Sequence, residues 1–400
     1  MSAAAPPAAA TPGDLGEAGE VDGLPGPLRL GPLEVETPVV LAPMAGITNA
    51  AYRRLCRESG AGLYVCEMIT SRGLVEGDEM TRSMLVFDEL EDVRSVQLYG
   101  TDPRYVGEAT RILCAEHGVA HVDLNFGCPV PKVTRKGGGA ALPWKTSLLA
   151  DILAAAVAAA EPFGVPVTMK TRLGIDSDHL TYRDAGRAAQ ESGAAAIALH
   201  GRTAQQAYAG EADWEPIGEL AALLDIPVLG NGDIWEAEDA LRMVRQTGAA
   251  GVVVGRGCLG RPWLFRDLAA AFAGQQVQVM PMLGEVADTM RRHAELLVQH
   301  STSEERGCKE FRKHVSWYLK GFPVGGEMRR RLALVSSLAE LDALLADLDR
   351  EARFPEAALG TPRGRQGSPR RRVALPEGWL DDRDAPAAVG AEDLDSGSGG

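Results

Sequence analysis

The chain has 400 residues, 45% of them apolar, and a formal net charge of −14. That composition can bury a substantial core, which excludes a chain disordered throughout. The acidic balance argues against a general polyanion binder, because phosphate contacts dominate nucleic-acid affinity. The six cysteines include no C-x-x-C pair and no cluster at zinc-ligand spacing, so we expect neither a disulfide framework nor a metal site.

The two ends of the chain differ from its middle. Residues 1–27 and 353–400 are rich in Pro, Gly, Ala and Ser and lack hydrophobic periodicity, so both are predicted to be disordered. The opening stretch has no basic region followed by an apolar one, and no apolar run approaches the length of a membrane span. We therefore expect a cytoplasmic protein without a membrane segment.

Residues 28–280 are predicted to form one domain. Between about residues 39 and 260 it repeats one pattern, in which a short apolar run is followed by a turn and a helix-length segment rich in Ala, Leu and charge. Continuous apolar runs suit the strands of a parallel sheet that helices cover. Eight such units predict an α/β fold of the (β/α)8 TIM-barrel type, and a doubly wound sheet, which would not need eight strands, is the alternative. The runs are VVLAPM (39–44), LYVCEM (63–68), RSVQLYG (94–100), HVDLNFG (121–127), VTMKTRLG (167–174), AIALHGR (196–202), VLGNGD (228–233) and GVVVGR (251–256).

The pattern changes after the last of these runs. Residues 281–352 contain consecutive helical segments without strands between them, which predicts a smaller all-helical domain. Basic residues gather there, between Arg306 and Arg331. Taken alone, such a run is more often a solvated helix face than a binding surface.

In a barrel the catalytic groups sit at the C-terminal ends of the strands. One buried polar residue there could be structural, but polar or turn residues at the end of every predicted strand make coincidence a poor account. These residues are Pro43 and Met44, Glu67, Gln97, Asn125 with Cys128, Lys170 with Arg172, His200 with Arg202, Asn231 with Asp233, and Gly255 with Arg256.

The last two strands end in NGD and GRG, whose glycines let backbone N–H groups approach an anion where barrels commonly bind phosphate. Gly255, Gly257 and Gly260 also match G-x-G-x-x-G, but that fingerprint belongs to the first strand of a βαβ unit, so the match is weak. Lys170 and His200 could lie near a cofactor ring, where positive charge stabilises an anionic reduced state. The strand ends therefore indicate redox chemistry with a phosphate-bearing cofactor.

The stretch NFGCPVPK (125–132) follows the fourth predicted strand. Asn125 and Gly127 bend the chain out of the strand and Pro129 prevents an immediate helix, which places Cys128 on a loop over the barrel mouth. Neither a base nor a helix N-terminus is adjacent in sequence to activate this thiol as a nucleophile. A proton donor is therefore the better interpretation of Cys128.

At these residues the chain resembles the tRNA-dihydrouridine synthase family, in its bacterial B-type branch. The resemblance covers about residues 30–345 and leaves out both ends of the chain. The motifs that carry it are LAPMAGITNAAYRRL, VQLYG, VDLNFGCPVPKVTRKGGGAAL, VTMKTRLG, LHGRTAQQAYAGEADW, IPVLGNGDI, GRGCLGRPWLF and RKHVSWYLKGFP.

The resemblance implies an enzyme that reduces the C5=C6 bond of particular uridines in tRNA, with FMN as cofactor and NADPH as the reductant that recharges it. Reduced FMN would deliver hydride to C6 of uracil while Cys128, as general acid, protonates C5 from the opposite face. The residues implied to contact FMN are Pro43, Met44, Ala45, Gln97, Lys170, His200, Asn231, Gly232, Asp233, Gly255 and Arg256.

On the substrate side, Asn125 would help to orient the base, and Arg172 is open between a substrate contact and a barrel scaffold. A uracil ring cannot reach a barrel floor while it is stacked in folded tRNA, so the nucleotide must be flipped out at a cost of roughly a few kcal/mol. The basic residues expected to hold the RNA backbone are Lys132, Arg135, Arg312 and Lys313. Nothing in the sequence demands a partner subunit, so we expect a monomer.

Two other functions stay open at this point. An FMN barrel acting on a free pyrimidine would not need a helical domain that holds RNA. A non-catalytic tRNA-binding factor would not need a complete rim of flavin-contacting residues. The sequence does not say which uridine is reduced.

Overall fold

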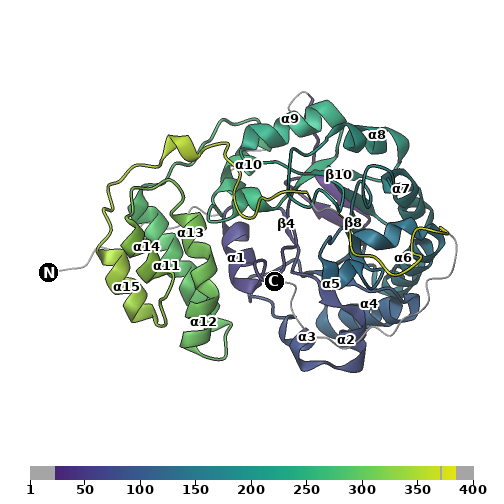
Figure 1. Cartoon of the computed structure of the whole chain (residues 1–400), viewed down its shortest axis with the longest axis horizontal. Coiled ribbons are helices and arrows are strands. Elements are labelled where there is room, and N and C mark those ends of the chain that lie inside the picture. The colour runs from purple at the N-terminus through teal and green to yellow at the C-terminus, as the bar shows by residue number, and fades with distance from the viewer. Residues whose placement is uncertain (1–22, 370–371, 384–400) are drawn as a thin grey trace.

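The computed structural model describes residues 23–369 and 372–383. Most of the N-terminal extension that we predict to be disordered, residues 1–22, lies outside the described residues. Figure 1 shows a large α/β barrel with a smaller bundle of helices beside it.

The barrel is built from a parallel sheet with the strand order β4-β3-β11-β10-β9-β8-β7-β6-β5. The short strands β4 and β5 are two parts of one strand position, since Val65, directly after β4, bridges Ser95 of β6 and so closes the ring. Eight strand positions result, and the predicted (β/α)8 barrel is confirmed. The strands are β3 (Val39–Leu41), β4 (Leu63–Tyr64), β5 (Ile69–Thr70), β6 (Ser95–Tyr99), β7 (His121–Phe126), β8 (Val167–Arg172), β9 (Ala196–His200), β10 (Val228–Asn231) and β11 (Gly251–Val254).

Helices cover the outside of the barrel and bury one face each against the strands. Their ends follow local chemistry: the Asn49 side chain caps the first helix by accepting from Tyr52 N, and Gly118 ends α4 in the left-handed conformation. The helices are α1 (Ala50–Glu58), α2 (Ser71–Glu76), α3 (Glu79–Ser83), α4 (Pro103–His117), α6 (Thr146–Ala160), α7 (Tyr182–Glu191), α8 (Glu215–Leu223), α9 (Ala237–Thr247) and α10 (Leu264–Phe272).

One helical stretch, Thr146–Phe163, is long and apolar enough to cross a membrane by length and composition, contrary to our expectation that no run approaches that length. This stretch contains α6, which packs between α4 and α7 in the helical layer of the barrel. Its side chains Leu149, Ile152, Leu153 and Ala156 are buried in the core of the chain. Because 28% of the stretch is buried inside the structure, packing explains only part of its apolar composition.

A hairpin closes the N-terminal end of the barrel. Its strands β1 (Leu28–Leu30) and β2 (Leu33–Val35) pair antiparallel. Leu28 and Leu30 are buried in a cluster with interior side chains of the barrel strands, among them Val40, Leu229 and Val253. The hairpin side chains therefore fill this end of the barrel, and the cavity lies at the C-terminal ends of the strands.

The second unit consists of helices only, as the sequence predicts. They are α11 (Leu283–Gln299), α12 (Glu304–Phe311), α13 (Val315–Tyr318), α14 (Gly326–Leu332) and α15 (Leu338–Ala346). The long helix α11 packs against α12 and α15 and reaches α1 of the barrel. This contact fixes the bundle to one side of the barrel (Figure 1).

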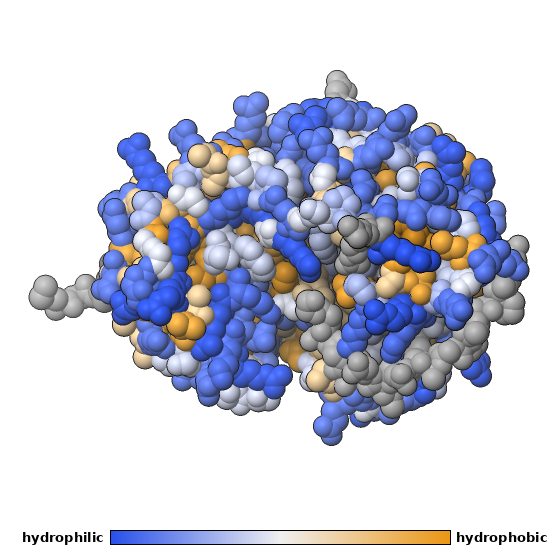
Figure 2. Space-filling view, in the orientation of Figure 1, coloured by the Kyte–Doolittle hydropathy of each residue, from blue (hydrophilic) through white to orange (hydrophobic). Residues whose placement is uncertain are grey.

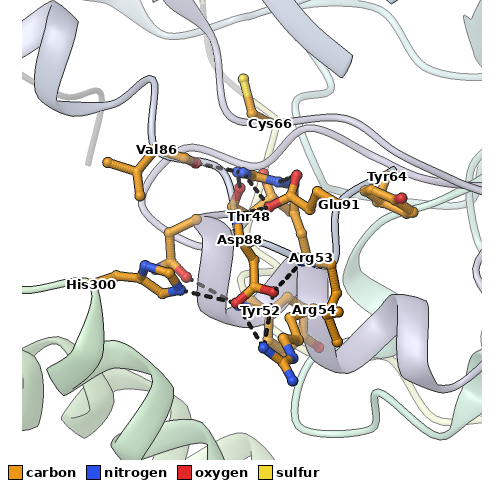
Figure 3. A network of polar contacts seen from close by, with 12 residues as sticks. Thr48, Tyr52, Arg53, Arg54, Tyr64, Cys66, Val86, Asp88, Glu91 and His300 are labelled. Carbon is orange, nitrogen blue, oxygen red and sulfur yellow. Dashed lines mark hydrogen bonds and ion pairs between the residues drawn. The ribbon is translucent and has the colours of Figure 1, made fainter. Parts of the chain in front are cut away.

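Polar contacts join the two units at α1 (Figure 3). Arg54 Nη1 on α1 donates to both carboxylate oxygens of Asp88, at 2.9 and 3.0 Å. Asp88 Oδ2 also lies 3.3 Å from Nε2 of His300, at the end of α11. Behind it, Arg53 and Glu91 form an ion pair at 2.8 Å in which both side chains are buried. Arg53 also donates to the carbonyl oxygen of Thr48, so this pair holds the loop that follows β3.

The prediction of a disordered tail over 353–400 is wrong for the part that the structure describes, whereas residues 370–371 and 384–400 lie outside the described residues. Residues 354–369 and 372–383, which we name the strap, cross the front of the barrel in Figure 1. Its side chains Phe354, Arg363, Val373 and Trp379 are buried. The prediction failed because these few anchors are spaced without a helix or strand period, so tertiary contacts alone order the segment.

Candidate active site

A cavity of about 490 Å³ opens at the C-terminal ends of the barrel strands. This volume is in the usual range of small-molecule sites. The structure brings fourteen of the predicted site residues to its wall, although their roles stay predictions. These are Pro43, Met44, Ala45, Gln97, Asn125, Cys128, Lys170, Arg172, His200, Asn231, Gly232, Asp233, Gly255 and Arg256.

A chain of hydrogen bonds inside the barrel orients Gln97 and Asn125. Gln97 Nε2 donates to Asp123 Oδ2 at 2.7 Å, and Asn125 Nδ2 donates to Gln97 Oε1 at 2.9 Å. Thr168 Oγ1 donates to the other oxygen of Asp123 at 2.7 Å. Burial raises the pKa of Asp123, while the hydrogen bonds from Gln97 and Thr168 oppose that shift. The two amides therefore present fixed polar atoms at the cavity floor.

Cys128 lies half-buried on a loop that three contacts hold in place. Asn125 Oδ1 accepts from the backbone N–H of Gly127 at 3.0 Å and of Cys128 at 2.9 Å. Arg172 Nε donates to the carbonyl oxygen of Gly127 at 2.8 Å. Gly139 has φ +54, and a Cβ there would stand 2.5 Å from the Cys128 carbonyl oxygen, so only glycine lets the returning chain pass. These contacts fix the backbone of the loop, and Cys128 lines the cavity.

Basic side chains from the ends of β8 and β9 also line the cavity. Burial, followed by the charge of the neighbouring Arg172, lowers the pKa of Lys170 to about 7. Burial, followed by the charge of Arg172, holds the pKa of His200 well below its ordinary value, so this imidazole is neutral near pH 7. Arg202 donates to both oxygens of Asp233, at 2.8 and 2.7 Å, behind the cavity wall.

The charged residues lining the cavity fit an anionic ligand. Lys170, Arg172, Arg256 and Arg365 line it, whereas Asp233 is the one carboxylate among the lining residues. That carboxylate is already engaged by Arg202 and lies 3.4 Å from Arg256 Nη2. The chain as a whole has a net charge of −14, but basic residues gather around this cavity and give it a net positive charge. Such a cavity suits a phosphate group.

The other predicted substrate residues lie outside the cavity wall. Lys132 is half-buried on the short helix α5 (Pro131–Thr134), and Arg135 is exposed directly after it. Arg312 Nε donates to the carbonyl oxygen of Val335 at 2.8 Å. Lys313 pairs with Glu310 at 2.6 Å, and its Nζ lies 3.6 Å from the position of a Cβ on Gly46, beside the loop that carries Met44 and Ala45.

Sequence reasoning missed several lining residues. Tyr208 lies between two cations, with the guanidinium carbons of Arg172 and Arg256 at 5.7 and 5.0 Å from its ring centre. Trp235 and Trp317 also line the cavity, as do Arg365–Ser368 of the strap. Tyr208 and Trp317 stand inside two of the quoted motifs, AQQAYAG and SWYLK, so a signal existed for them. The sequence motifs gave no such signal for the lining residues of the strap.

Among the residues that the structure describes, no group of three or more His, Cys, Asp or Glu side chains is placed to hold a metal ion.

Comparison with solved structures relates the chain to a histamine dehydrogenase from Rhizobium sp. 4-9. The TM-score is 0.50 at 12% sequence identity, and the match covers 82% of this chain and 65% of that one. At this identity the likeness shows the fold alone.

Sequence comparison is far more specific. The family model described as dihydrouridine synthase (Dus) matches residues 40–353. A probable tRNA-dihydrouridine synthase of Mycobacterium tuberculosis is 54% identical over 379 residues, which covers 92% of this chain and 97% of the relative. A tRNA-dihydrouridine synthase B of Xanthomonas axonopodis is 39% identical and covers 80% and 94%. The resemblance seen in the motifs is confirmed, and the chain belongs to the dihydrouridine synthase family.

Proposed function

We propose that the protein reduces the C5=C6 bond of specific uridines in tRNA to give 5,6-dihydrouridine. The names of the relatives support this reaction, since those proteins are described as tRNA-dihydrouridine synthases. The observation that carries the proposal is the cavity itself. It combines a thiol on a pre-set loop, two fixed amides and a cationic wall within one site that is closed at its other end.

FMN is the cofactor that we propose for this cavity. The cations and the glycine turns after β10 and β11 suit its phosphate, and Met44, Trp235 and Trp317 offer apolar surface for its ring. The residues that would hold it are Pro43, Met44, Ala45, Gln97, Lys170, His200, Asn231, Gly232, Asp233, Gly255 and Arg256. When bound, FMN supplies the hydride for C6 of uracil, and NADPH restores its reduced form.

Cys128 is the proposed proton donor to C5. Its loop position is fixed through Asn125 and Arg172, so the thiol can stand at a defined distance from a bound base. Asn125 and Gln97 form one hydrogen-bonded pair at the cavity floor, which suits the amide edges of a uracil ring. Arg172 donates to three backbone carbonyls, of Gly127, Thr203 and Ala207, so its principal task is to hold the loops on both sides of it.

The RNA must deliver one nucleotide into this cavity while its backbone stays outside. We propose that Lys132 and Arg135 on one side, and Arg312 and Lys313 of the helical domain on the other, contact that backbone. Figure 2 shows a largely hydrophilic face around the junction of the two units, as such a contact requires. We expect the protein to act as a monomer in the cytoplasm.

The test is a reaction of the purified, flavin-loaded protein with an unmodified tRNA transcript and NADPH. We expect nucleoside mass spectrometry to find a gain of two hydrogens on uridine at a defined position, and none without NADPH. Free uridine and uracil serve as parallel substrates. Reduction of the free pyrimidine with no change in the tRNA would overturn the proposal in favour of the free-pyrimidine oxidoreductase, and tRNA binding without reduction would favour a binding factor.

A further inference from the structure

The strap is held at its first end by buried contacts. Arg363 is 3% exposed, and its Nη1 donates to the carbonyl oxygens of Leu259, at 3.2 Å, and Trp317, at 2.9 Å. Lys320 Nζ donates to Thr361 Oγ1 at 2.7 Å. These contacts tie the strap to the loop after β11 and to the helical domain at once.

The second end is anchored beside the loop that carries Cys128. Trp379 is buried, and its Nε1 donates to the carbonyl oxygen of Ala141 at 3.0 Å. A Cβ on Gly137 would lie 2.4 Å from the Trp379 ring, which shows how closely the ring covers this loop. Arg383 pairs with Asp184 of α7 at 2.7 Å. Both ends are therefore fixed on opposite sides of the barrel mouth.

Between the anchors, the strap forms part of the cavity wall. Residues 365–368 line the same cavity as Cys128, Asn125 and Arg256. Arg256 Nη1 donates to the carbonyl oxygen of Arg365 at 2.8 Å. Gly364 has φ +68, and a Cβ there would come within 2.6 Å of Leu259, so glycine brings the strap close to the barrel.

The charge of this part of the strap is of one sign. The sequence from Ala357 to Pro376 contains five arginines and no Asp or Glu, in a chain of net charge −14. Within the described residues the side chains of Arg365 and Arg372 are exposed, and neither forms an ion pair. The basic residues Lys313 and Arg330 of the helical domain, in contrast, each face a carboxylate at 2.6 and 2.9 Å.

The strap also lies beyond the family model, whose match ends at residue 353. An alignment that covers 92% of this chain needs about 368 of its residues, so the match with the mycobacterial relative must extend into the strap. The match with the Xanthomonas enzyme covers 80% and does not require it. The strap is thus an addition to the dihydrouridine synthase fold that some relatives share.

We propose that the strap is an RNA-binding element of the active site, in which Arg365 contacts a backbone phosphate next to the flipped nucleotide. The inference rests on the proposed function, since it assigns a further contact to the same substrate. An exposed guanidinium without an acidic partner among the described residues, carried on an anchored segment at the cavity mouth, is suited to bind a phosphate oxygen. The hydrogen bond from Arg256 Nη1 to the carbonyl oxygen of Arg365 holds this residue against the barrel rim.

The experiment compares Arg365→Ala with Arg29→Ala in steady-state reduction of an unmodified tRNA transcript at several salt concentrations. Arg29 is an exposed arginine on the hairpin at the opposite end of the barrel. We expect Arg365→Ala to raise the KM for tRNA by about three- to tenfold and to lower the slope of log KM against log salt by about one. Arg29→Ala should change neither, and Arg365→Lys should restore most of the salt slope.

Four results separate the proposal from its competitors. Unchanged KM and salt slope in Arg365→Ala, with a wild-type enzyme that makes dihydrouridine, would overturn the strap proposal alone. A lower KM for tRNA in that variant would overturn it in favour of a strap that competes with the substrate. If the wild type makes no dihydrouridine, the proposed function fails, and the strap proposal that rests on it fails with it. The thermal midpoint of each variant should match that of the wild type because the Arg365 side chain is exposed. A loss of bound flavin in Arg365→Ala would overturn the proposal in favour of a cofactor contact.

Discussion

The barrel mouth and the helical domain both carry basic residues, but the two regions use them differently. At the mouth, Lys170, Arg172 and Arg256 line a cavity whose one carboxylate, Asp233, is already bound by Arg202. Positive charge therefore remains for a ligand. In the helical domain, Lys309, Lys313 and Arg330 each lie 2.5 to 2.9 Å from a glutamate one helical turn away.

A further basic residue of the helical domain is a structural group. Arg329 donates to the carbonyl oxygens of Val324, Leu319 and Phe322, at 2.7 to 2.8 Å, and so fixes the turn before α14. A count of basic residues therefore does not locate an anion site. What decides is whether a carboxylate in the folded chain already balances the charge of each cation, because a paired cation offers less to a new partner.

The largest effect on the reaction rate is expected from a substitution at the barrel mouth, at Cys128. Cys128→Ala removes the proposed proton donor and should lower the single-turnover rate of dihydrouridine formation by about 10²- to 10⁴-fold, the range for general acids. Flavin content should not change. Cys114→Ala, which removes a thiol on the outer helix α4, serves as the control and should keep the wild-type rate. A loss of only a few-fold in Cys128→Ala would refute the acid assignment.

The second prediction concerns the pH dependence of folding stability at the interface between the barrel and the helical domain. His293 and His314 lie buried there with ring centres 4.4 Å apart. Burial lowers the pKa of His293 to about 3 and that of His314 well below its ordinary value. When a histidine takes up a proton only in the unfolded chain, the folded protein loses stability as the pH falls below the unfolded pKa of about 6.5. Each should therefore cost about 2 kcal/mol of folding free energy at pH 5 relative to pH 8.

His314→Leu tests this, because neither ring nitrogen of His314 has a hydrogen-bond partner among the described residues. We expect the free energy of unfolding, measured with urea, to fall by about 2 kcal/mol less between pH 8 and pH 5 than in the wild type. The difference between the two proteins at pH 8 measures packing alone and serves as the control. An equal fall in both proteins would show that His314 does not limit acid stability.

The smallest effect should come from the helical domain. Glu310→Gln removes the carboxylate that pairs with Lys313 and so frees this cation for the RNA. The KM for tRNA should fall by about two- to threefold at low salt, since an exposed pair contributes less than about 1 kcal/mol, and the gain should vanish at high salt. Glu34→Gln, which releases Arg29 at the far end of the barrel, should leave KM unchanged. A KM that does not fall in Glu310→Gln would remove Lys313 from the RNA contact.

The sequence was sufficient for the barrel and for most of its cavity. The eight apolar runs became the eight strand positions, because a strand buried on both faces needs a continuous apolar run and little else. Polar residues such as Gln97, Lys170 and His200 came together at one end, since parallel strands carry their C-terminal ends to the same rim. These are properties of local pattern and chain direction, and both can be read without knowing any contact.

Only the tertiary structure decided which charges are free and where the strap lies. Asn125 holds the Cys128 loop, and Arg172 supports it from the next strand, through bonds between elements that the sequence does not pair. Trp379 and Arg363 order a segment that composition alone marks as disordered, because a few buried side chains offset the entropy of fixing it. Periodicity records the neighbours of a residue along the chain, whereas acceptors, ion pairs and anchors depend on neighbours that only folding brings close.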